Sequence, residues 1–467
     1  MAEAAAAPIG APQGREDGPR RRLSPAVPGP RPRRTARLAR LAIALAAVTA
    51  GAACARAPAG DGGRIDRGST PASQDASAGA SPDGTVHVGR HGKVVPHDPP
   101  AGPGAMAPEL APAAGGGAWL SWLEPHEDGH RLRVARFRDG AWGEPSTVVA
   151  GEGFFANWAD VPSVAEDGEG TLLVHWLEMT GEGAYDYGIE LARSDDGGAS
   201  WRRLGPLHAD GVPAEHGFVT LLGDPRGGFE AFWLDGREVP SGGPMTLRTA
   251  RVGADGPQGE RLLDDRVCDC CPTAAGWTAD GLLLAYRGRT ADEVRDNLAL
   301  VRRGGSWSGP VPIADEGWRI AACPVNGPAV AVADGRAAVA WFTAADDRPR
   351  VETAWRKPGG GFGPPALVDD ERPLGRVDAV TLPDGSAAVS WLSADGGVRL
   401  RRLRPQGSLG EPRLLARTST ARASGIPRMA RTGDALLVVW VETPPEDAAP
   451  RAGTRLRAVS VPFAALP

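Results

Sequence analysis

From residue 105 onward the chain repeats one pattern, which constrains its fold more than any other feature. Each repeat has an apolar segment of small residues, a turn with Gly or Asp-Gly, and a second apolar segment that ends in an aromatic residue. Segments of this length and alternation, separated by such turns, are typical of short β-strands. The aromatic residues recur about every 50 positions, and they are Trp122, Trp176, Trp233, Tyr286, Trp341, Trp391 and Trp440.

A polar loop and a third alternating segment follow each aromatic residue, and most repeats add a fourth strand after a further turn. Four short strands in each unit of about 50 residues predict an all-β fold, a β-propeller of four-stranded blades. The repeat count predicts seven blades, and a six-bladed ring with one aberrant unit is the alternative. The last repeat stops after its third strand, RLRAVSVPF, so we expect residues 85–90, TVHVGR, to supply the missing strand.

The charge of the chain argues against one class of partner. Charged residues make up 23% of the sequence, and the formal net charge is -5. A protein that holds nucleic acid needs a basic surface to neutralise phosphates, and this composition does not provide one. We therefore expect no nucleic-acid partner.

The first part of the chain reads as an export signal followed by a linker. Residues 31–54 contain several arginines, then an apolar run too short to span a bilayer, then small residues before Cys54. That ending resembles the lipobox of bacterial lipoproteins, although Gly51 departs from it, and plain secretion is the alternative. Residues 1–54 are thus the predicted signal, 55–104 a disordered linker rich in Gly, Ala, Ser and Pro, and 105–467 the propeller. We expect an exported monomer in the periplasm or cell envelope, held to the membrane only by a lipid on Cys54.

A short motif in the second repeat carries a family resemblance. The stretch SDDGGASW, residues 194–201, matches the Asp-box pattern Ser-x-Asp-x-Gly-x-Thr-Trp with serine in place of threonine. It resembles the Asp box, or BNR repeat, of the sialidase superfamily, where the motif is a folding element on the turn between the third and fourth strands. The chain is also similar to bacterial sialidase-like exported lipoproteins. The motif residues are Ser194, Asp196, Gly198, Ser200 and Trp201.

The resemblance implies a set of catalytic residues. Sialidases hold the substrate carboxylate with three arginines, and they use an Asp as acid/base and a Glu-activated Tyr as nucleophile. The matching candidates are Arg287, Arg376, Arg428 and, for the acid/base, Asp160. Two departures put sialidase activity in doubt, because no Tyr follows residue 286 and the early Phe/Tyr-Arg-Ile-Pro motif is missing. The alternative is a rearranged site in which Tyr185 or Tyr187, in a loop of the second repeat, supplies the nucleophile.

Alignment of the seven first strands indicates where a ligand would bind. In a propeller these strands line the central channel, and the loops that enter them form a ligand-binding face. The fourth repeat departs from the others there, since Tyr286 and Arg287 replace Trp-Leu, and such departures often mark function. The predicted ligand-binding residues are Trp158, Glu215, His216, Tyr286, Arg289, Trp318 and Asn326, and the alignment also places Asp160 at the entrance of the second repeat.

Four of the five cysteines fall at the same end of the channel. Cys271 begins CPTAAGW in the fourth repeat and Cys323 begins CPVNGPA in the fifth, so the alignment makes them near neighbours. With Cys268 and Cys270 they form a predicted cluster. Export favours two disulfides among the four, which would require no cofactor. The alternative is a copper or zinc ion held by the thiolates, with His216 as a possible nitrogen ligand.

These observations leave three functional hypotheses. The first is an envelope-anchored propeller that binds a glycan or another small anionic ligand at its channel mouth, without catalysis. The second is a glycoside hydrolase of the exo-sialidase type. The third is a thiolate-metal or redox protein that uses the cysteine cluster.

Overall fold

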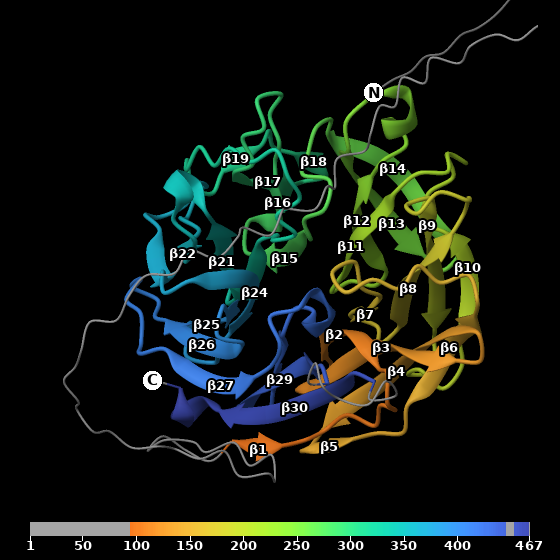
Figure 1. Cartoon of the computed structure of the whole chain (residues 1–467), viewed down its shortest axis with the longest axis horizontal. Coiled ribbons are helices and arrows are strands. Elements are labelled where there is room, and N and C mark those ends of the chain that lie inside the picture. The colour runs from red at the N-terminus through yellow and green to blue at the C-terminus, as the bar shows by residue number, and fades with distance from the viewer. Residues whose placement is uncertain (1–93, 445–452, 467) are drawn as a thin grey trace, which may run out of the picture. The chain divides into compact units, whose positions relative to one another are not determined.

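The computed structural model describes residues 94–444 and 453–466, which form seven antiparallel sheets arranged around a central channel (Figure 1). The predicted signal, the lipidation candidate Cys54 and most of the predicted linker lie outside the described residues. The prediction of an all-β propeller with seven blades is confirmed. No α-helix occurs in the described part of the chain, and none of its helical turns could span a membrane.

Each of the first three blades runs from the channel outward in chain order. Blade 1 contains β2 (Met106–Ala113), β3 (Gly117–His126), β4 (Gly129–Arg138), β5 (Ala141–Trp142) and β6 (Ser146–Gly151). Blade 2 contains β7 (Ser163–Glu166), β8 (Leu172–Met179), β9 (Tyr187–Ser194) and β10 (Arg202–Pro206). Blade 3 contains β11 (His216–Gly223), β12 (Phe229–Asp235), β13 (Thr246–Gly253) and β14 (Gly256–Asp264).

The remaining blades keep the same order until the last one. Blade 4 contains β15 (Ala274–Thr278), β16 (Gly281–Arg287), β17 (Asn297–Arg303), β18 (Ser306–Trp307) and β19 (Val311–Pro312). Blade 5 contains β20 (Ala329–Ala333), β21 (Arg336–Thr343), β22 (Arg350–Trp355) and β23 (Ala366–Asp369). Blade 6 contains β24 (Pro373–Thr381), β25 (Ala387–Ser393), β26 (Gly397–Leu403) and β27 (Arg413–Arg417), and blade 7 contains β28 (Arg428–Thr432), β29 (Ala435–Glu442) and β30 (Arg455–Pro462).

The fourth strand of blade 7 comes from the other end of the described chain. It is β1 (Val95–Pro96), which pairs antiparallel with β30. Asp98 adds an ion pair to Arg457 at 2.6 Å, and the main-chain N–H of Gly104 donates to Thr454 O. The segment predicted for this role, residues 85–90, lies outside the described residues. Residues 94–104, predicted to belong to a disordered linker, instead contact the last blade and blade 1, where Trp142 donates to His97 O and Glu124 accepts from Gly102 N–H.

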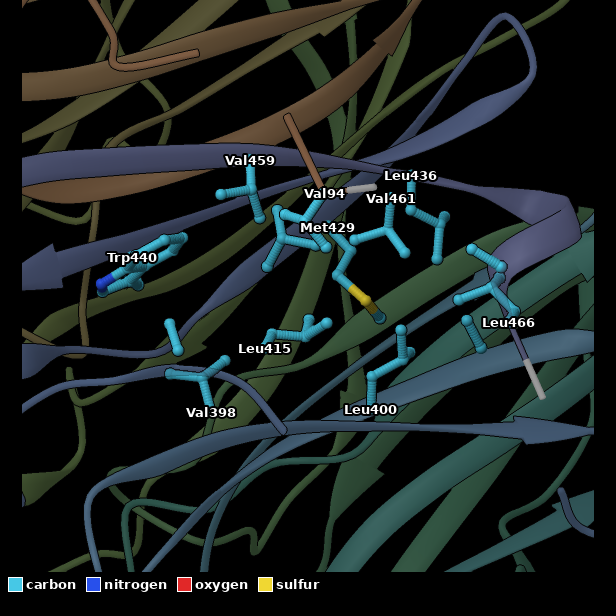
Figure 2. Packing of buried hydrophobic residues seen from close by; sticks show 14 of the residues in the cluster. Val94, Val398, Leu400, Leu415, Met429, Leu436, Trp440, Val459, Val461 and Leu466 are labelled. Atoms are coloured by element: carbon cyan, nitrogen blue, oxygen red, sulfur yellow. The ribbon is translucent and has the colours of Figure 1, made fainter. Parts of the chain in front are cut away.

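Apolar clusters between neighbouring blades make up the core. The cluster between blades 6 and 7 is shown in Figure 2, where Val94 lies among Met429, Val459 and Val461. Val94 is therefore part of the packing that joins the two ends of the ring. Burial of an aliphatic side chain of this size contributes about 1.5–3 kcal/mol to stability.

The aromatic residue of every repeat lies on the second strand of its blade and is buried. In five blades its polar hydrogen is donated to a carboxylate, so burial leaves no unpaired donor there. The pairs are Trp122 with Glu124, Trp233 with Asp235, Tyr286 with Asp264, Trp341 with Glu316 and Trp391 with Asp369. Tyr286, predicted to bind ligand, therefore occupies the structural position that tryptophan fills in the other blades.

The turn between β9 and β10 has the hydrogen bonding that the Asp-box pattern requires. Asp196 Oδ1 accepts from the main-chain N–H of Ser200 at 2.9 Å, and Oδ2 accepts from the Ser200 hydroxyl at 2.6 Å. Gly198 N–H donates to Ser194 Oγ, and Trp201 reaches blade 1 by donating to Ser146 Oγ. These bonds stabilise a tight turn and tie two blades together.

Candidate functional site

A cavity of about 410 Å³ occupies the central channel and is lined by the first strands of all seven blades. Most of the lining is aliphatic, which is usual for a ligand cavity with a few polar groups. The charged and amide side chains among the lining residues are Glu109, Asp160, Asn326, Arg376, Asp378, Arg428 and Arg431.

Tyr187, at the start of β9, links two carboxyl groups where the loops enter the first strands of blades 2 and 3. The Tyr187 hydroxyl is 2.9 Å from Asp160 Oδ2 and 3.1 Å from Glu215 Oε1. Asp160 lies in the loop that enters β7, and Glu215 immediately precedes β11. Asp160 Oδ1 also accepts from the main-chain N–H of Phe218 at 2.7 Å. The site thus consists of a cavity-lining carboxyl, a buried phenol and a second, half-buried carboxyl.

Close approach of the Asp160 side chain to β11 requires glycine at position 217. A Cβ atom at Gly217 would lie 1.9 Å from Asp160 Oδ2. Any side chain there would therefore displace the carboxyl from Tyr187. The sequence of β11 is in this way adapted to the network of Asp160, Tyr187 and Glu215, which we call the carboxyl network.

Burial changes the ionisation of the carboxyl network. Desolvation raises the pKa of Asp160 to about 7, although hydrogen bonds from Phe218 and Tyr187 oppose the shift. Desolvation raises the pKa of Glu215 to about 8, with the nearby charge of Asp160 as the next cause. The pKa of Tyr187 lies well above its usual range, chiefly because the phenolate would be desolvated. At neutral pH the network therefore retains protons that exposed carboxyls would lose.

A second pair of carboxyl groups lines the cavity on the side of blades 1, 6 and 7. Arg428 forms an ion pair with Glu109 at 2.8 Å, and Asp378 Oδ2 accepts from the main-chain N–H of Met429. Burial raises the pKa of Glu109 to about 7 against the attraction of Arg428. Desolvation also raises the pKa of Asp378. Arg428, predicted to bind a substrate carboxylate, is thus already paired with a carboxyl of the protein.

The other two arginines of the predicted triad are also engaged. Arg287 is 1% exposed and does not line the cavity; it donates to the main-chain oxygens of Asn326, Arg295 and Phe342. Arg376 lines the cavity, but its guanidinium donates to the main-chain oxygens of residues 420, 421 and 425. Both side chains therefore hold loops together, and neither offers an open fork for a ligand carboxylate.

The predicted aromatic and amide residues support these arginines. Arg287 lies over the ring of Trp318 at 4.8 Å, and Arg376 lies over the ring of Trp158 at the same distance. Such cation–π contacts stabilise a buried guanidinium. Asn326 Oδ1 accepts from the main-chain N–H of Arg376 at 2.6 Å. Of Trp158, Trp318 and Asn326, only Asn326 also lines the cavity.

The predicted clustering of the cysteines is borne out by their positions. The Sγ atoms of Cys268, Cys270 and Cys271 lie within 4.8 Å of one another, and Cys323 neighbours Cys270. All four are free thiols, so the predicted disulfides are not formed in the structure. Three convergent thiols could also hold a thiophilic metal ion.

Charged side chains surround the thiols. Arg289 pairs with Asp269 at 2.7 Å and with Glu293 at 2.6 Å, so this predicted ligand-binding residue is neutralised on both sides. Arg295 is 3% exposed and donates to Cys268 Sγ at 3.4 Å. The loop of mixed charge in blade 4 is therefore packed against the thiols.

His216 has partners other than the cysteines. Its ring stacks on His208 at 3.9 Å, and Nδ1 lies 3.0 Å from Ala214 O. Nε2 is buried without a hydrogen bond, 3.4 Å from Asp210 Oδ1 and 3.8 Å from Asp235 Oδ1. The described contacts place His216 in an electrostatic cluster of blade 3, where His208, Asp210 and His216 could together hold a cation.

Comparison with known proteins establishes the fold and no family. No protein-family model matches the chain, and no curated protein matches it. A lectin from Burkholderia pseudomallei superimposes with a TM-score of 0.55 at 15% identity, over 78% of this chain and 99% of the lectin. An ulvan lyase bound to -[GlcA(1-4)Rha3S]- superimposes with a TM-score of 0.50 at 13% identity, over 79% and 96% of the two chains. An α-L-arabinofuranosidase from Fusarium graminearum gives 0.47 at 13% identity, over 80% and 99%. The predicted membership of the sialidase superfamily is not shown by these similarities.

The strand alignment predicted Asp160 and Glu215 as residues at the channel entrance but did not predict that Tyr187 joins them. Tyr187 was assigned to a loop, whereas it begins β9 and stacks on Phe155 at 3.9 Å. Its alternating register with Ile189 and Leu191, which are buried on the same strand, is the sequence signal that could have identified it.

Proposed function

We propose that the protein binds a carbohydrate at the mouth of its central channel, through the carboxyl network. The observation that carries the proposal is the hydrogen-bonded chain from Asp160 through Tyr187 to the half-buried Glu215. Protonated carboxyls both donate and accept hydrogen bonds, as sugar hydroxyls do. Two proteins that share the fold, the lectin and the ulvan lyase, are named for carbohydrate binding or cleavage, which supports the same ligand class.

The engaged arginines favour a ligand recognised through its hydroxyl groups over a small anion. Arg287 and Arg376 donate to main-chain oxygens, and Arg428 is paired with Glu109. A ligand carboxylate would have to displace these contacts before it could bind a guanidinium. We therefore place carbohydrate first and an anionic ligand second.

A glycan array probed with the purified protein tests the proposal. We expect binding to a restricted set of glycans and at least a tenfold loss of affinity in Glu215→Gln, about 1.4 kcal/mol. Glu411→Gln, which changes an exposed carboxyl beyond the channel, is the matched control and should bind as the original protein does. No glycan binding, or equal binding by both variants, would contradict the proposal.

Hydrolysis of a glycoside is the second candidate function. The two carboxyls with raised pKa favour it, since a general acid must hold its proton near neutral pH. Tyr187 is 1% exposed with a raised pKa, so it is unsuited to the nucleophilic role that a sialidase gives its tyrosine. Release of fluorophore from a panel of glycosides, a sialoside among them, tests this function; activity abolished by Asp160→Asn would establish it.

We also infer export and lipid attachment at Cys54 from the sequence of residues 1–54. The inference concerns residues outside those that the structure describes. Fractionation of expressing cells should place the protein with the membrane, and Cys54→Ala should release it. Membrane association that persists in that variant would contradict attachment through Cys54.

A further inference from the structure

Two thiols with different surroundings meet where the loops entering blades 4 and 5 touch. Cys323 is exposed in the loop before β20, whereas Cys270 is buried in the loop before β15. The two thiols are neighbours, and each perturbs the ionisation of the other. An accessible thiol can form a mixed disulfide with a molecule from solution. A buried thiol in contact with it can then attack that mixed disulfide and release the molecule.

We propose that Cys323 and Cys270 form a thiol–disulfide exchange site whose substrates are low-molecular-weight or protein disulfides. The Cys323 thiolate attacks one sulfur of the disulfide, forms a mixed disulfide and releases the first thiolate. Cys270, after losing its proton, attacks the Cys323 sulfur, and the second thiolate leaves. Two electrons pass from the pair to the substrate, which becomes two thiols, while a Cys270–Cys323 bond forms.

The backbone already places the two loops together. A Cβ atom at Gly327 would lie 1.8 Å from Pro272 O, so the chain four residues after Cys323 lies directly against the residue that follows Cys271. This contact holds the loops at short range without a covalent bond. The two loops that carry Cys270 and Cys323 are therefore adjacent before any bond forms between them.

Accessibility distinguishes the two thiols. Cys323 is exposed, whereas Cys270 is buried. Two arginines flank the cysteine cluster: Arg289 pairs with Asp269, and Arg295 donates to Cys268 Sγ at 3.4 Å. Cationic neighbours favour the thiolate, which is the reactive form of cysteine. Only the exposed sulfur can meet a disulfide from solution, so Cys323 is the attacking thiol and Cys270 resolves.

The other two cysteines support this assignment by their position. Cys268 and Cys271 are both 1% exposed and adjoin each other, and Cys268 Sγ accepts from the buried Arg295. Neither is accessible to a disulfide in solution. The exchange reaction is therefore assigned to Cys270 and Cys323 alone.

The test follows the reduced full-length protein after addition of oxidised glutathione, with acid quenching, alkylation and peptide mapping by mass spectrometry. The original protein should form an internal Cys270–Cys323 bond with little adduct. Cys270→Ser cannot resolve the intermediate, so glutathionylated Cys323 should accumulate at least tenfold over the original protein. Cys323→Ser should form no adduct at the cluster, and Ala322→Ser, an adjacent exposed change, should behave as the original protein does.

Three results would overturn the proposal. The first is an internal bond that joins Cys323 to Cys268 or Cys271; the second is equal adduct with and without Cys270. The third is a stoichiometric zinc or copper ion, found by elemental analysis, that protects the thiols. Because Cys323 is exposed, Cys323→Ser should fold, so peptide mapping of this variant and of the original protein decides the question even if Cys270→Ser does not fold.

Discussion

The Tyr187 hydroxyl and Asp160 Oδ2 are 2.9 Å apart where blades 2 and 3 meet, with Glu215 completing the hydrogen-bonded chain. Substitution Tyr187→Phe removes the hydroxyl and leaves two carboxyls without this partner. We expect a loss of about 1–3 kcal/mol in the free energy of unfolding, measured by urea denaturation. Tyr185→Phe changes a phenol that is 58% exposed and should have almost no effect. Equal effects of the two substitutions would show that the bridge adds nothing to stability.

The raised pKa of Glu215 predicts how stability depends on pH. The folded protein keeps the Glu215 proton up to a pKa of about 8, whereas the unfolded chain loses it near 4.5. Between these values the folded state binds more protons, so stability is fully present below pH 4.5 and falls as pH rises toward 8. The thermal midpoint should therefore decrease between pH 5 and 8, and less so in Glu215→Gln. A midpoint with the same pH dependence in both proteins would contradict the shift.

The N-terminal strand of blade 7 predicts a sharp boundary for truncation. A chain that begins at Pro99 lacks β1, the buried Val94 and the ion pair from Asp98 to Arg457. We expect it to be less stable by about 3 kcal/mol, from the lost apolar burial and main-chain hydrogen bonds. A chain that begins at Gly92 keeps these contacts and should unfold as the longer protein does. Denaturant titration of both truncations checks this difference.

The turn between β9 and β10 offers a comparison of neighbouring aspartates. Asp196 accepts two hydrogen bonds from Ser200 and one from Ser194, so Asp196→Ala should lower the thermal midpoint measurably. Asp195 forms an ion pair with Arg193 and is exposed, and such pairs contribute at most about 1 kcal/mol. Calorimetry on the two alanine variants should rank them in this order, and the reverse ranking would refute a structural role for the motif.

The fold was predictable because its repeating signal is local. Each blade has a buried aromatic residue on its second strand and a turn with Gly or Asp before that strand. Each blade can therefore be predicted from its own sequence alone. The start of the domain was less predictable. Composition suggests a linker for residues 94–104, yet Asp98 and Gly104 bond to Arg457 and Thr454, more than 300 positions away, and Gly102 donates to Glu124 of blade 1.

The sequence predicted where the site lies but not which hydrogen bonds its side chains form. Alignment of the first strands placed Asp160 and Glu215 at the channel entrance, because equivalent positions in a repeat occupy equivalent places in the ring. Arg287 shows the limit of that reasoning. Whether its guanidinium is open to a ligand depends on main-chain oxygens of Asn326, in the loop before β20, and Phe342, in β21. The direction of a main-chain oxygen cannot be read from the pattern of side chains.

Closure of blade 7 also dictates the order of events during synthesis. His97 and Ser460, which are hydrogen-bonded across the closure, are separated by 363 positions, so the ribosome makes β1 long before its partner β30 exists. Blades 1 to 6 can pair their strands as they emerge, while the edge of blade 7 stays open until the final segment is released. The open edge of blade 7 in a nascent chain can therefore pair with a strand of another copy. A chaperone that shields unpaired strands would have its greatest effect at this edge.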